Sequence, residues 1–380
     1  MKVPFNLPFL AGNELKYIQE AIHRYAHISG NGYYTQHAQH LLEHKYGYPK
    51  VLLTSSCTDA LEMCALLARL DPGDEVIVPA YTFVSTANAF ALRNVRLRFA
   101  DCQADFPNID PDHVESLINS RTRAIVIMHY GGVACDMERF HQMARKHDLF
   151  LIEDAAQAVG AYYYDHPLGS IGDFGTLSFH ETKNIISGEG GALIVNNPNY
   201  MNRAEILWEK GTNRTAFKRG EVEKYEWVDI GSSFLPSEIT AAFLYAQLEH
   251  MDTINQARLA AWEYYHQRLT PLEAKGYVEI PHPPPYARHN GHLFYVLLQD
   301  TPTRNRLISY LRHQGIVAVF HYLPLHQSPF AQRMGYRTRL PHAERYGNTL
   351  LRLPIYYRMR REEQDHVINA LYRFFQSPEI

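Results

Sequence analysis

Residues 150–157, FLIEDAAQ, and residues 176–195, TLSFHETKNIISGEGGALIV, decide the fold, because in each a short apolar run turns into polar residues. Such runs are typical of buried β-strands. The strands expected here are Phe150–Ile152, Thr176–Phe179 and Ala192–Val195. Asp154 follows closely on the first strand, and Lys183 lies in the polar segment after the second. Since ligands of open α/β sheets bind beyond the carboxyl ends of strands, these two side chains are the first candidates for a functional site.

The pattern of short apolar runs repeats toward the N-terminus. Further strands are expected at Val51–Thr54, Glu75–Val78 and Ala124–Met128. The helical patterns between them cover Thr58–Leu70, a stretch after Asp110, and a stretch from Asp136 to near His147. Strands that alternate with helices at this spacing predict parallel crossover connections, and therefore an α/β fold with a doubly wound, mostly parallel sheet.

A smaller C-terminal region follows a long helical stretch, Ser237–Leu269, which we expect to join two lobes. Its expected elements are the strands Leu293–Leu298 and Ile316–Phe320 and the helix Thr303–His313. We therefore expect a large domain of residues 1–250 and a small α/β domain of residues 251–380. Basic residues gather between residues 200 and 235, in either a solvated loop or an ordered loop that faces an anionic ligand.

The composition limits the classes of function. The 37 Lys and Arg against 40 Asp and Glu give a net charge of −3, which argues against a protein that holds nucleic acid on a basic surface. The four cysteines form no Cys-x-x-Cys pair, so no metal site is predicted and free thiols are expected. Because no apolar run is long enough for a signal peptide or a membrane span, we expect a cytoplasmic protein with no membrane partner.

Three features point to a cofactor when they are taken together. Residues 54–58, TSSCT, lie where a strand turns into a helix, a place where phosphate binds, although helix capping alone explains the same residues. Asp154 either holds the protonated ring nitrogen of a cofactor or caps the next helix. A lone lysine that follows a strand, such as Lys183, is usually a surface residue. A phosphate site, a carboxylate and a lysine in this order across one α/β unit are, however, the groups that pyridoxal 5′-phosphate (PLP) requires.

These residues belong to longer motifs, through which the chain resembles the DegT/DnrJ/EryC1/StrS family of PLP-dependent sugar aminotransferases, a branch of fold type I. The motifs are residues 79–86 (PAYTFVST), 210–214 (KGTNR), 231–234 (GSSF), 320–326 (FHYLPLH) and 351–354 (LRLP). Within the family, residues 180–184 (HETKN) together with KGTNR and GSSF most resemble the members that aminate C4 of dTDP-4-dehydro-6-deoxy-D-glucose for enterobacterial common antigen.

The resemblance assigns the catalytic and cofactor-binding roles. It implies that Lys183 links to PLP and shuttles the proton, and that Asp154 pairs with the pyridinium nitrogen. The other implied contacts are Gln157 near the phenolic oxygen, Phe83 on the ring face, Ser178, Thr58 and the backbone at Cys57 on the phosphate, and Ser233 on the phosphate from a second subunit. Ser233 stands where many relatives carry Asn, so its donor is shorter. A lysine at position 183, where the dehydratases of this family carry histidine, argues against dehydration.

Five further residues are candidates for binding the nucleotide sugar: Tyr33, His180, Arg214, His321 and Tyr322. Tyr33, in a glycine-rich loop, either closes over the substrate or packs in a core or an interface. Arg214 either meets a substrate phosphate or is solvated, and His180 either packs beside the cofactor or has a structural role. His321 and His326 are five residues apart, which without a third ligand is a poor metal signal.

The implied reaction moves an amino group from L-glutamate to C4 of dTDP-4-dehydro-6-deoxy-D-glucose, giving dTDP-4-amino-4,6-dideoxy-D-galactose and 2-oxoglutarate, in a homodimer with shared active sites. The alternatives are a sibling enzyme that acts at C3 or on a UDP- or GDP-linked sugar, and a non-catalytic sugar-binding or regulatory relative. A nicotinamide-dependent dehydrogenase is disfavoured because no G-x-G-x-x-G follows the first strand.

Overall fold

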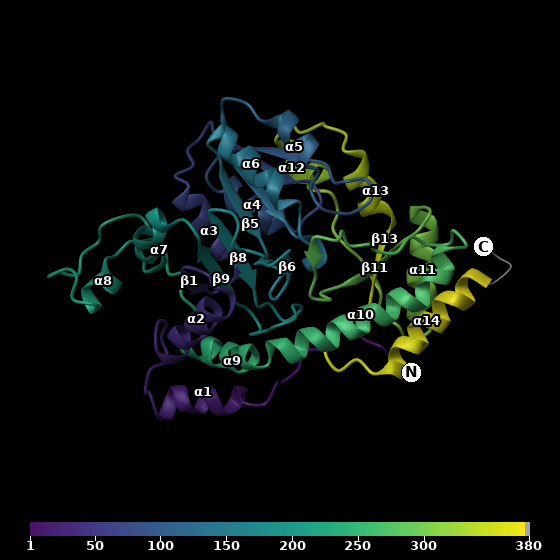
Figure 1. Ribbon diagram of the computed structural model, residues 1–380, viewed down its shortest axis with the longest axis horizontal. Helices are drawn as coiled ribbons and strands as arrows, with labels where there is room; N and C mark the ends of the chain where they lie inside the picture. The colour runs from purple at the N-terminus through teal and green to yellow at the C-terminus, as the bar shows by residue number, and fades with distance from the viewer. Residues whose placement is uncertain (377–380) are drawn as a thin grey trace.

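The computed structural model describes residues 1–376, and its centre is a seven-stranded sheet in the order β1-β9-β8-β5-β4-β2-β3 (Figure 1). The strands are β1 Val51–Thr54, β2 Glu75–Pro79, β3 Arg96–Ala100, β4 Thr122–Met128, β5 Phe150–Asp154, β8 Phe174–Ser178 and β9 Gly191–Val195. The pairs β2–β3, β2–β4, β4–β5 and β5–β8 are parallel, whereas β9 is antiparallel to both β1 and β8. The predicted α/β fold with a mostly parallel sheet is confirmed, and each strand expected between residues 50 and 200 is present.

Two differences from the expected sheet have clear causes. Strand β3 escapes a search for apolar runs because Arg96 and Arg98 alternate with apolar residues, as suits a strand at the sheet edge. Strand β9 runs antiparallel to β8, and the connection between them, residues 179–190, contains no helix of the kind that usually makes a parallel crossover. That loop carries Lys183 back across the carboxyl end of β8.

Helices cover both faces of the sheet. Along β2, Val76 and Val78 belong to the apolar layer of one face, and Ile77 belongs to the layer of the other. The first face packs on α3 (Cys57–Leu67), α4 (Val84–Ala91) and α7 (Met201–Trp208). The second face packs on α2 (Tyr33–Tyr46), α5 (Pro111–Leu117), α6 (Met137–His147) and α9 (Glu238–Glu249). Both faces are therefore buried, which explains why the strands are almost continuously apolar.

The residues that the sequence predicts at the starts of helices do cap them. Ser56 accepts a hydrogen bond from the Asp59 N–H at the start of α3, and Asp136 accepts one from the Arg139 N–H at the start of α6. Asp110 caps α5, in which Pro111 takes the first position. A side-chain acceptor at this place satisfies an N–H group that has no partner within the helix.

The C-terminal part of the chain is built on a three-stranded antiparallel sheet, β11-β13-β12. Its strands are β11 Phe294–Leu297, β12 Val319–Phe320 and β13 Leu350–Leu353. The remaining helices are α1 Glu14–His23, α8 Arg214–Lys218, α10 Met251–Glu273, α11 Thr301–His313, α12 Pro329–Arg333, α13 Pro341–Thr349 and α14 Arg361–Gln376. A third small sheet consists of β10 (Ala287–Arg288), β6 (Tyr162–Tyr163) and β7 (His166–Pro167).

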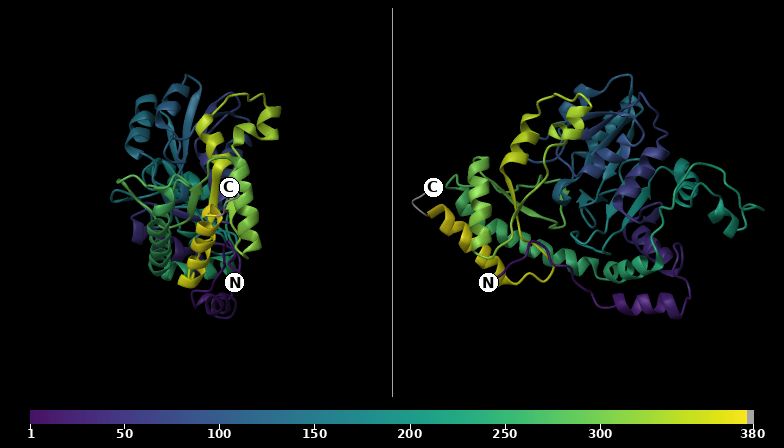
Figure 2. Two further views of the ribbon diagram at one scale, coloured as in Figure 1. Left: turned by 90° about the vertical axis from the view of Figure 1, so that its right-hand side faces the viewer. Right: turned by 180° about the vertical axis from the view of Figure 1, so that it is seen from behind.

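The expected helix Ser237–Leu269 is in fact two helices, α9 and α10, which meet at His250. The long α10 runs along the lower side of the molecule in Figure 1 and reaches the C-terminal sheet. The N-terminal segment lies beside that sheet region as well, because Val3 pairs with Ile316 (Figure 2). Among the described residues, none of the helices combines the length and the apolar character needed to cross a membrane.

Candidate functional site

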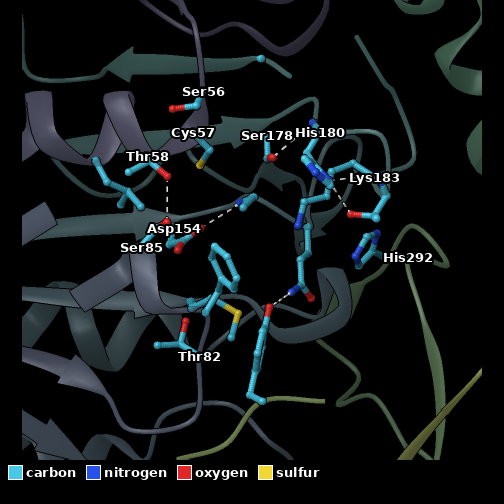
Figure 3. Close-up of a pocket in the computed structure, with 18 of the residues that line it drawn as sticks. Ser56, Cys57, Thr58, Thr82, Ser85, Asp154, Ser178, His180, Lys183 and His292 are labelled. Carbon is cyan, nitrogen blue, oxygen red and sulfur yellow. Dashed lines mark hydrogen bonds between the residues drawn. The ribbon is translucent and has the colours of Figure 1, made fainter. Parts of the chain in front are cut away.

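A cavity of about 520 Å³ opens at the carboxyl ends of β5 and β8, between the large sheet and the C-terminal part of the chain. All but three of the residues predicted for the site line it: Cys57, Thr58, Phe83, Asp154, Gln157, Ser178, His180, Lys183, His321 and Tyr322. Figure 3 shows Thr58, Ser85 and Asp154 on one side of the cavity and Lys183 and His292 on the other. Residues up to 296 positions apart along the chain, Ser56 and Arg352, are thus brought together at this cavity.

One end of the cavity is suited to an anion. It is formed by the start of α3, where Ser56 caps the helix through the Asp59 N–H and leaves the N–H groups of Cys57 and Thr58 at the exposed helix end. The hydroxyl of Thr58 lies 2.8 Å from that of Ser85, and Ser178 lies nearby at the end of β8. Backbone N–H groups, hydroxyls and the positive end of a helix dipole together favour phosphate.

Asp154 ends strand β5 and is almost fully buried. Its Oδ2 accepts a 2.6 Å hydrogen bond from the hydroxyl of Thr86, and its Oδ1 accepts one of 3.1 Å from the Ala156 N–H. Burial raises the pKa of Asp154, and these two hydrogen bonds and the nearby Lys183 partly offset that rise. The side chain is therefore a fixed, desolvated carboxyl group that a cationic partner would hold in the ionised form.

Lys183 follows β8 in a turn closed by its own N–H, which donates to the His180 carbonyl. Burial lowers the pKa of its amine, while Cys57 and Asp154 partly oppose that effect. The next residue, Asn184, is buried and accepts a hydrogen bond from His292 Nδ1 at 2.9 Å. This contact fixes the backbone that carries the lysine, so the amine is held inside the cavity in an environment that favours its neutral, reactive form.

The far wall of the cavity comes from the C-terminal part of the chain. Gln157 donates from Nε2 to the hydroxyl of Tyr322 at 2.8 Å and accepts the Gly131 N–H through Oε1 at 2.7 Å. His321 stacks on Tyr322, and its Nδ1 lies 2.7 Å from the hydroxyl of Tyr130. Gln157 is therefore a bridge between the two parts of the chain as well as a lining residue.

Three predicted residues lie away from this cavity. Ser233 is exposed and its backbone pairs with Glu209, whose side chain lies 3.8 Å from Arg214 Nε. The same carboxylate accepts a 3.0 Å hydrogen bond from Asn31, two residues before Tyr33. Tyr33 stacks between Tyr25 and His37 at the start of α2. These residues thus form a surface neighbourhood of their own.

Several residues that line the cavity were not predicted from the sequence: Thr82, Ser85, Glu189, His292 and Arg352. Thr82, Ser85 and Arg352 lie inside the motifs that carry the family resemblance, so a search of those motifs for polar side chains would have found them. His292 had no local signal, because it reaches the site only through the fold of the C-terminal part.

Comparison with known proteins decides the family. The sequence profile of the DegT/DnrJ/EryC1/StrS aminotransferase family matches residues 10–372. The chain belongs to this family. SpsC of Bacillus subtilis, a spore coat polysaccharide biosynthesis protein, is 30% identical over 378 residues, which cover 97% of this chain and 96% of SpsC. The resemblance found in the motifs is therefore confirmed.

Two solved structures superpose on almost the whole chain. Spr1654 of Streptococcus pneumoniae in its PMP form has a TM-score of 0.91 and 25% identity, with 98% of this chain and 99% of that chain covered, and it is also solved in a PLP form. DesV of S. venezuelae has a TM-score of 0.89 and 29% identity, with both chains fully covered. The fold-type I prediction and the cofactor prediction are confirmed: the enzyme is an aminotransferase of the sugar aminotransferase family, and its cofactor is PLP.

Proposed function

We propose that this aminotransferase moves an amino group from L-glutamate to C4 of dTDP-4-dehydro-6-deoxy-D-glucose, giving dTDP-4-amino-4,6-dideoxy-D-galactose and 2-oxoglutarate. The main support for an aminotransferase site is that Lys183 and Asp154 line one cavity together with the hydroxyls at the start of α3. The choice of sugar rests on residues 180–184, 210–214 and 231–234, which most resemble the members of the family that act on this substrate.

The groups that line the cavity fit PLP in their chemistry. The phosphate would be held by the N–H groups at the start of α3 and by the hydroxyls of Thr58 and Ser178, to which the fold adds Ser85. Asp154 would hold the protonated ring nitrogen, because a buried carboxyl group with a raised pKa gains a compensating charge there. Gln157 would meet the phenolic oxygen, and Phe83, which is 56% exposed, would lie on the ring face.

The proton transfers are assigned to one atom, Lys183 Nζ. When bound, PLP supplies the electron sink that stabilises the negative charge left on carbon when a proton leaves. Because burial lowers the pKa of Lys183, its amine is neutral more often near neutral pH and accepts the α-proton of the donor. The ammonium so formed passes this proton on to the cofactor, and in the second half of the reaction the amine takes a proton back from the cofactor and delivers it to C4 of the sugar. A positioned base of this kind contributes roughly 10²- to 10⁴-fold in rate.

We further propose that the enzyme works as a homodimer with shared active sites. Ser233, Arg214 and Tyr33 lie outside the cavity of their own chain, as residues that serve a partner's cavity would. In this arrangement Ser233 adds a phosphate contact, and Arg214 and Tyr33 contact the nucleotide sugar. The remaining substrate contacts, from the same chain, are His180, His321 and Tyr322.

The proposed domains are residues 1–250, which bind the cofactor, and residues 251–380, the last four of which lie outside the described residues. The separate apolar cluster of the C-terminal part supports the division. Its members include Tyr265, Leu307, Leu351 and Phe374.

The test is an assay of the purified holoenzyme with L-glutamate and a panel of nucleotide-linked ketosugars, with the stereochemistry of each product determined. We expect the highest kcat/KM with dTDP-4-dehydro-6-deoxy-D-glucose and an amino group at C4 in the galacto configuration. Preference for a C3 ketone or for a UDP- or GDP-linked sugar would replace the proposal with a sibling aminotransferase. A protein that turns over none of them would be a binding or regulatory relative.

A further inference from the structure

A group of buried side-chain amides surrounds the residue that follows Lys183. That residue, Asn184, is almost fully buried and is not one of those that line the main cavity. Its Nδ2 donates to Oδ1 of Asn255 at 2.9 Å and to the carbonyl of Asn290 at 3.0 Å. Its Oδ1 accepts the 2.9 Å hydrogen bond from Nδ1 of His292. An amide has two N–H donors and one oxygen, so Asn184 uses all of them inside the protein.

Backbone carbonyls decide which way these amides point. A carbonyl only accepts, so the Asn184 atom that faces the Asn290 carbonyl is the nitrogen, and the atom that faces His292 is the oxygen. Asn255 is fixed in the same way by the Val159 carbonyl, 3.0 Å from its Nδ2. His292 then carries its proton on Nδ1, and burial together with nearby positive charges holds the pKa of the ring well below its ordinary value. The ring is therefore a neutral donor to Asn184.

The partners of Asn184 come from the C-terminal part of the chain. Asn255 lies on α10, and Asn290 and His292 lie just before β11. The backbone of His292 is held on both sides, because its N–H donates to Oδ1 of Asn290 at 3.1 Å and its carbonyl accepts from Arg258 of α10 at 2.6 Å. One side chain thus joins the loop after β8 to two segments of the C-terminal part.

These residues are packed too closely to rearrange freely. Gly160 and Gly291 have positive φ angles of 76° and 65°. A Cβ at Gly160 would lie 2.5 Å from Nδ2 of Asn255, and one at Gly291 would lie 2.7 Å from the backbone of Arg258 on α10. Glycine at these two positions lets the backbone approach its neighbours closely. Buried amides that are packed this closely and hydrogen-bonded on several sides keep one arrangement.

Lys183 needs a fixed backbone because its side chain has to stay free. In the proposed function, the amine links to PLP and then carries a proton, so only the backbone can hold its starting position constant. The Lys183 N–H donates to the His180 carbonyl on one side, and Asn184 is held on the other. A reacting group that is displaced by about 1 Å can lose roughly 100-fold in rate. The hydrogen bonds of Asn184 should therefore affect the rate at which the amine reaches PLP.

We propose that Asn184 is a positioning residue through which α10 and residues 290–292 orient Lys183 toward PLP. The inference rests on the proposed function, because it takes Lys183 as the lysine that links to the cofactor. His292 and Asn255 act through Asn184 in this proposal. Because His292 also lines the cavity, the test has to separate its contact with Asn184 from a contact with a ligand.

Two amide replacements of His292 separate the roles of its ring nitrogens. The amide nitrogen of asparagine is as many bonds from Cα as Nδ1 of histidine, and that of glutamine is as many as Nε2. PLP is added to the full-length protein freed of cofactor, and the rate at which the visible absorbance of the lysine-bound cofactor appears is measured. We expect Asn184→Leu and His292→Gln to lower this rate by about 10- to 100-fold, and His292→Asn to stay within about threefold of wild type.

Gln364→Leu is the matched control. Gln364 is as buried as these amides and donates a 2.8 Å hydrogen bond from α14 to the Ala261 carbonyl of α10, and it does not line the cavity. Like Asn184→Leu, it should lower the melting temperature, but it should leave the rate of lysine linkage unchanged. Amide hydrogen exchange of residues 181–187, measured with PLP bound, should rise in Asn184→Leu and not in Gln364→Leu.

Three results would overturn the proposal. An equal loss of rate in Gln364→Leu would show that lower stability alone slows the linkage. A rate that His292→Gln preserves and His292→Asn does not would place the role of His292 at Nε2, in contact with a ligand. A wild-type rate in Asn184→Leu would show that its hydrogen bonds do not position the lysine. Should Asn184→Leu not fold, the two amide variants of His292 carry the comparison.

The linkage rate also separates this inference from the proposed function. It needs neither an amino acid nor a sugar, so a wild type that forms the linkage but accepts no ketosugar loses the proposed substrate, while the role of Asn184 is still decided. Borohydride reduction that placed the wild-type adduct on a lysine other than Lys183 would refute the proposed role of Lys183 and this inference with it. An adduct on Lys183 with unchanged rates in the variants would refute the inference alone.

Discussion

The hydroxyl of Thr86, on α4, donates a 2.6 Å hydrogen bond to Oδ2 of Asp154 at the end of β5. Thr86 is itself fixed by the hydroxyl of Thr82, 2.7 Å away. Burial raises the pKa of Asp154, and the hydrogen bond from Thr86 is the largest of the effects that lower it. Thr86 therefore orients the carboxylate and favours its ionised form.

Replacing Thr86 by Val tests this relationship, because it removes the hydroxyl and keeps the branched shape. Without its donor, the pKa of Asp154 rises further above that of an ordinary carboxyl group. A function that needs the ionised carboxylate is lost as pH falls through that pKa, so the acid limb of kcat/KM should move to higher pH. The pH profile of the holoenzyme measures the shift. Thr86→Ser, which keeps the hydroxyl, should retain the wild-type limb, and identical profiles for Val and Ser variants would contradict the role given to Thr86.

Lys183→Ala should abolish transamination and the visible absorbance of the lysine-bound cofactor. The reason is that Lys183 is the lysine of the cavity, and a positioned base is worth roughly 10²- to 10⁴-fold even before the loss of cofactor attachment is counted. Steady-state assays and spectra of the purified protein measure both effects. Borohydride reduction followed by peptide mass spectrometry should place the adduct of the wild type on Lys183. Lys146→Ala, which removes a surface lysine paired with Glu115, is the control. A Lys183→Ala variant that kept both activity and absorbance would remove this lysine from the mechanism.

Asp154→Asn should lower turnover severely and leave the fold intact. The amide keeps the shape of the side chain and can still accept from Thr86, but it carries no negative charge for a pyridinium nitrogen. Turnover measured at saturating PLP, together with thermal unfolding of the same sample, separates the loss of chemistry from the loss of structure. Near-normal turnover would mean that Asp154 has only a structural role, as the acceptor of the hydrogen bond from the Ala156 N–H.

The strands that carry the site could be predicted from the sequence because both of their faces are buried. Runs such as Phe150–Ile152 and Thr176–Phe179 indicate strands directly, and Asp154 and Lys183 are polar residues that follow them. Family motifs, and not periodicity, supplied the residues on the C-terminal wall such as Tyr322. What could not be predicted is pairing across long sequence distances, such as Gln157 with Tyr322, because neither residue carries a local signal of the other. Arg352 was overlooked for a similar reason, since only the fold shows that it lacks a partner.

The residue next to Asp154 gives a prediction about stability. Glu153 is fully buried and accepts hydrogen bonds from the N–H groups of Gly169, Ile171 and Gly172. His129 Nε2 lies 3.0 Å from the same carboxylate. Glu153 thereby ties the loop before β8, and with it the approach to Ser178, to the centre of the sheet. Glu153→Gln turns an acceptor with two oxygens into one with a single oxygen, so at least one buried N–H loses its partner. Hydrogen bonds to a charged group contribute about 1.5–3 kcal/mol, and we expect the free energy of unfolding to fall by about 2–4 kcal/mol.

Denaturant unfolding of the Glu153→Gln holoenzyme at fixed PLP concentration measures this loss. Glu115→Gln, at an exposed ion pair with Lys146, is the matched control and should change stability little, because surface pairs contribute little. The structural role also predicts where amide hydrogen exchange rises first when the variant is heated. The N–H groups of the loop between Gly169 and Gly172 should exchange faster before those of the sheet do, since they are the groups that lose their acceptor. Equal stability of the two variants, or exchange that rises evenly across the sheet, would show that the carboxylate does not anchor this loop.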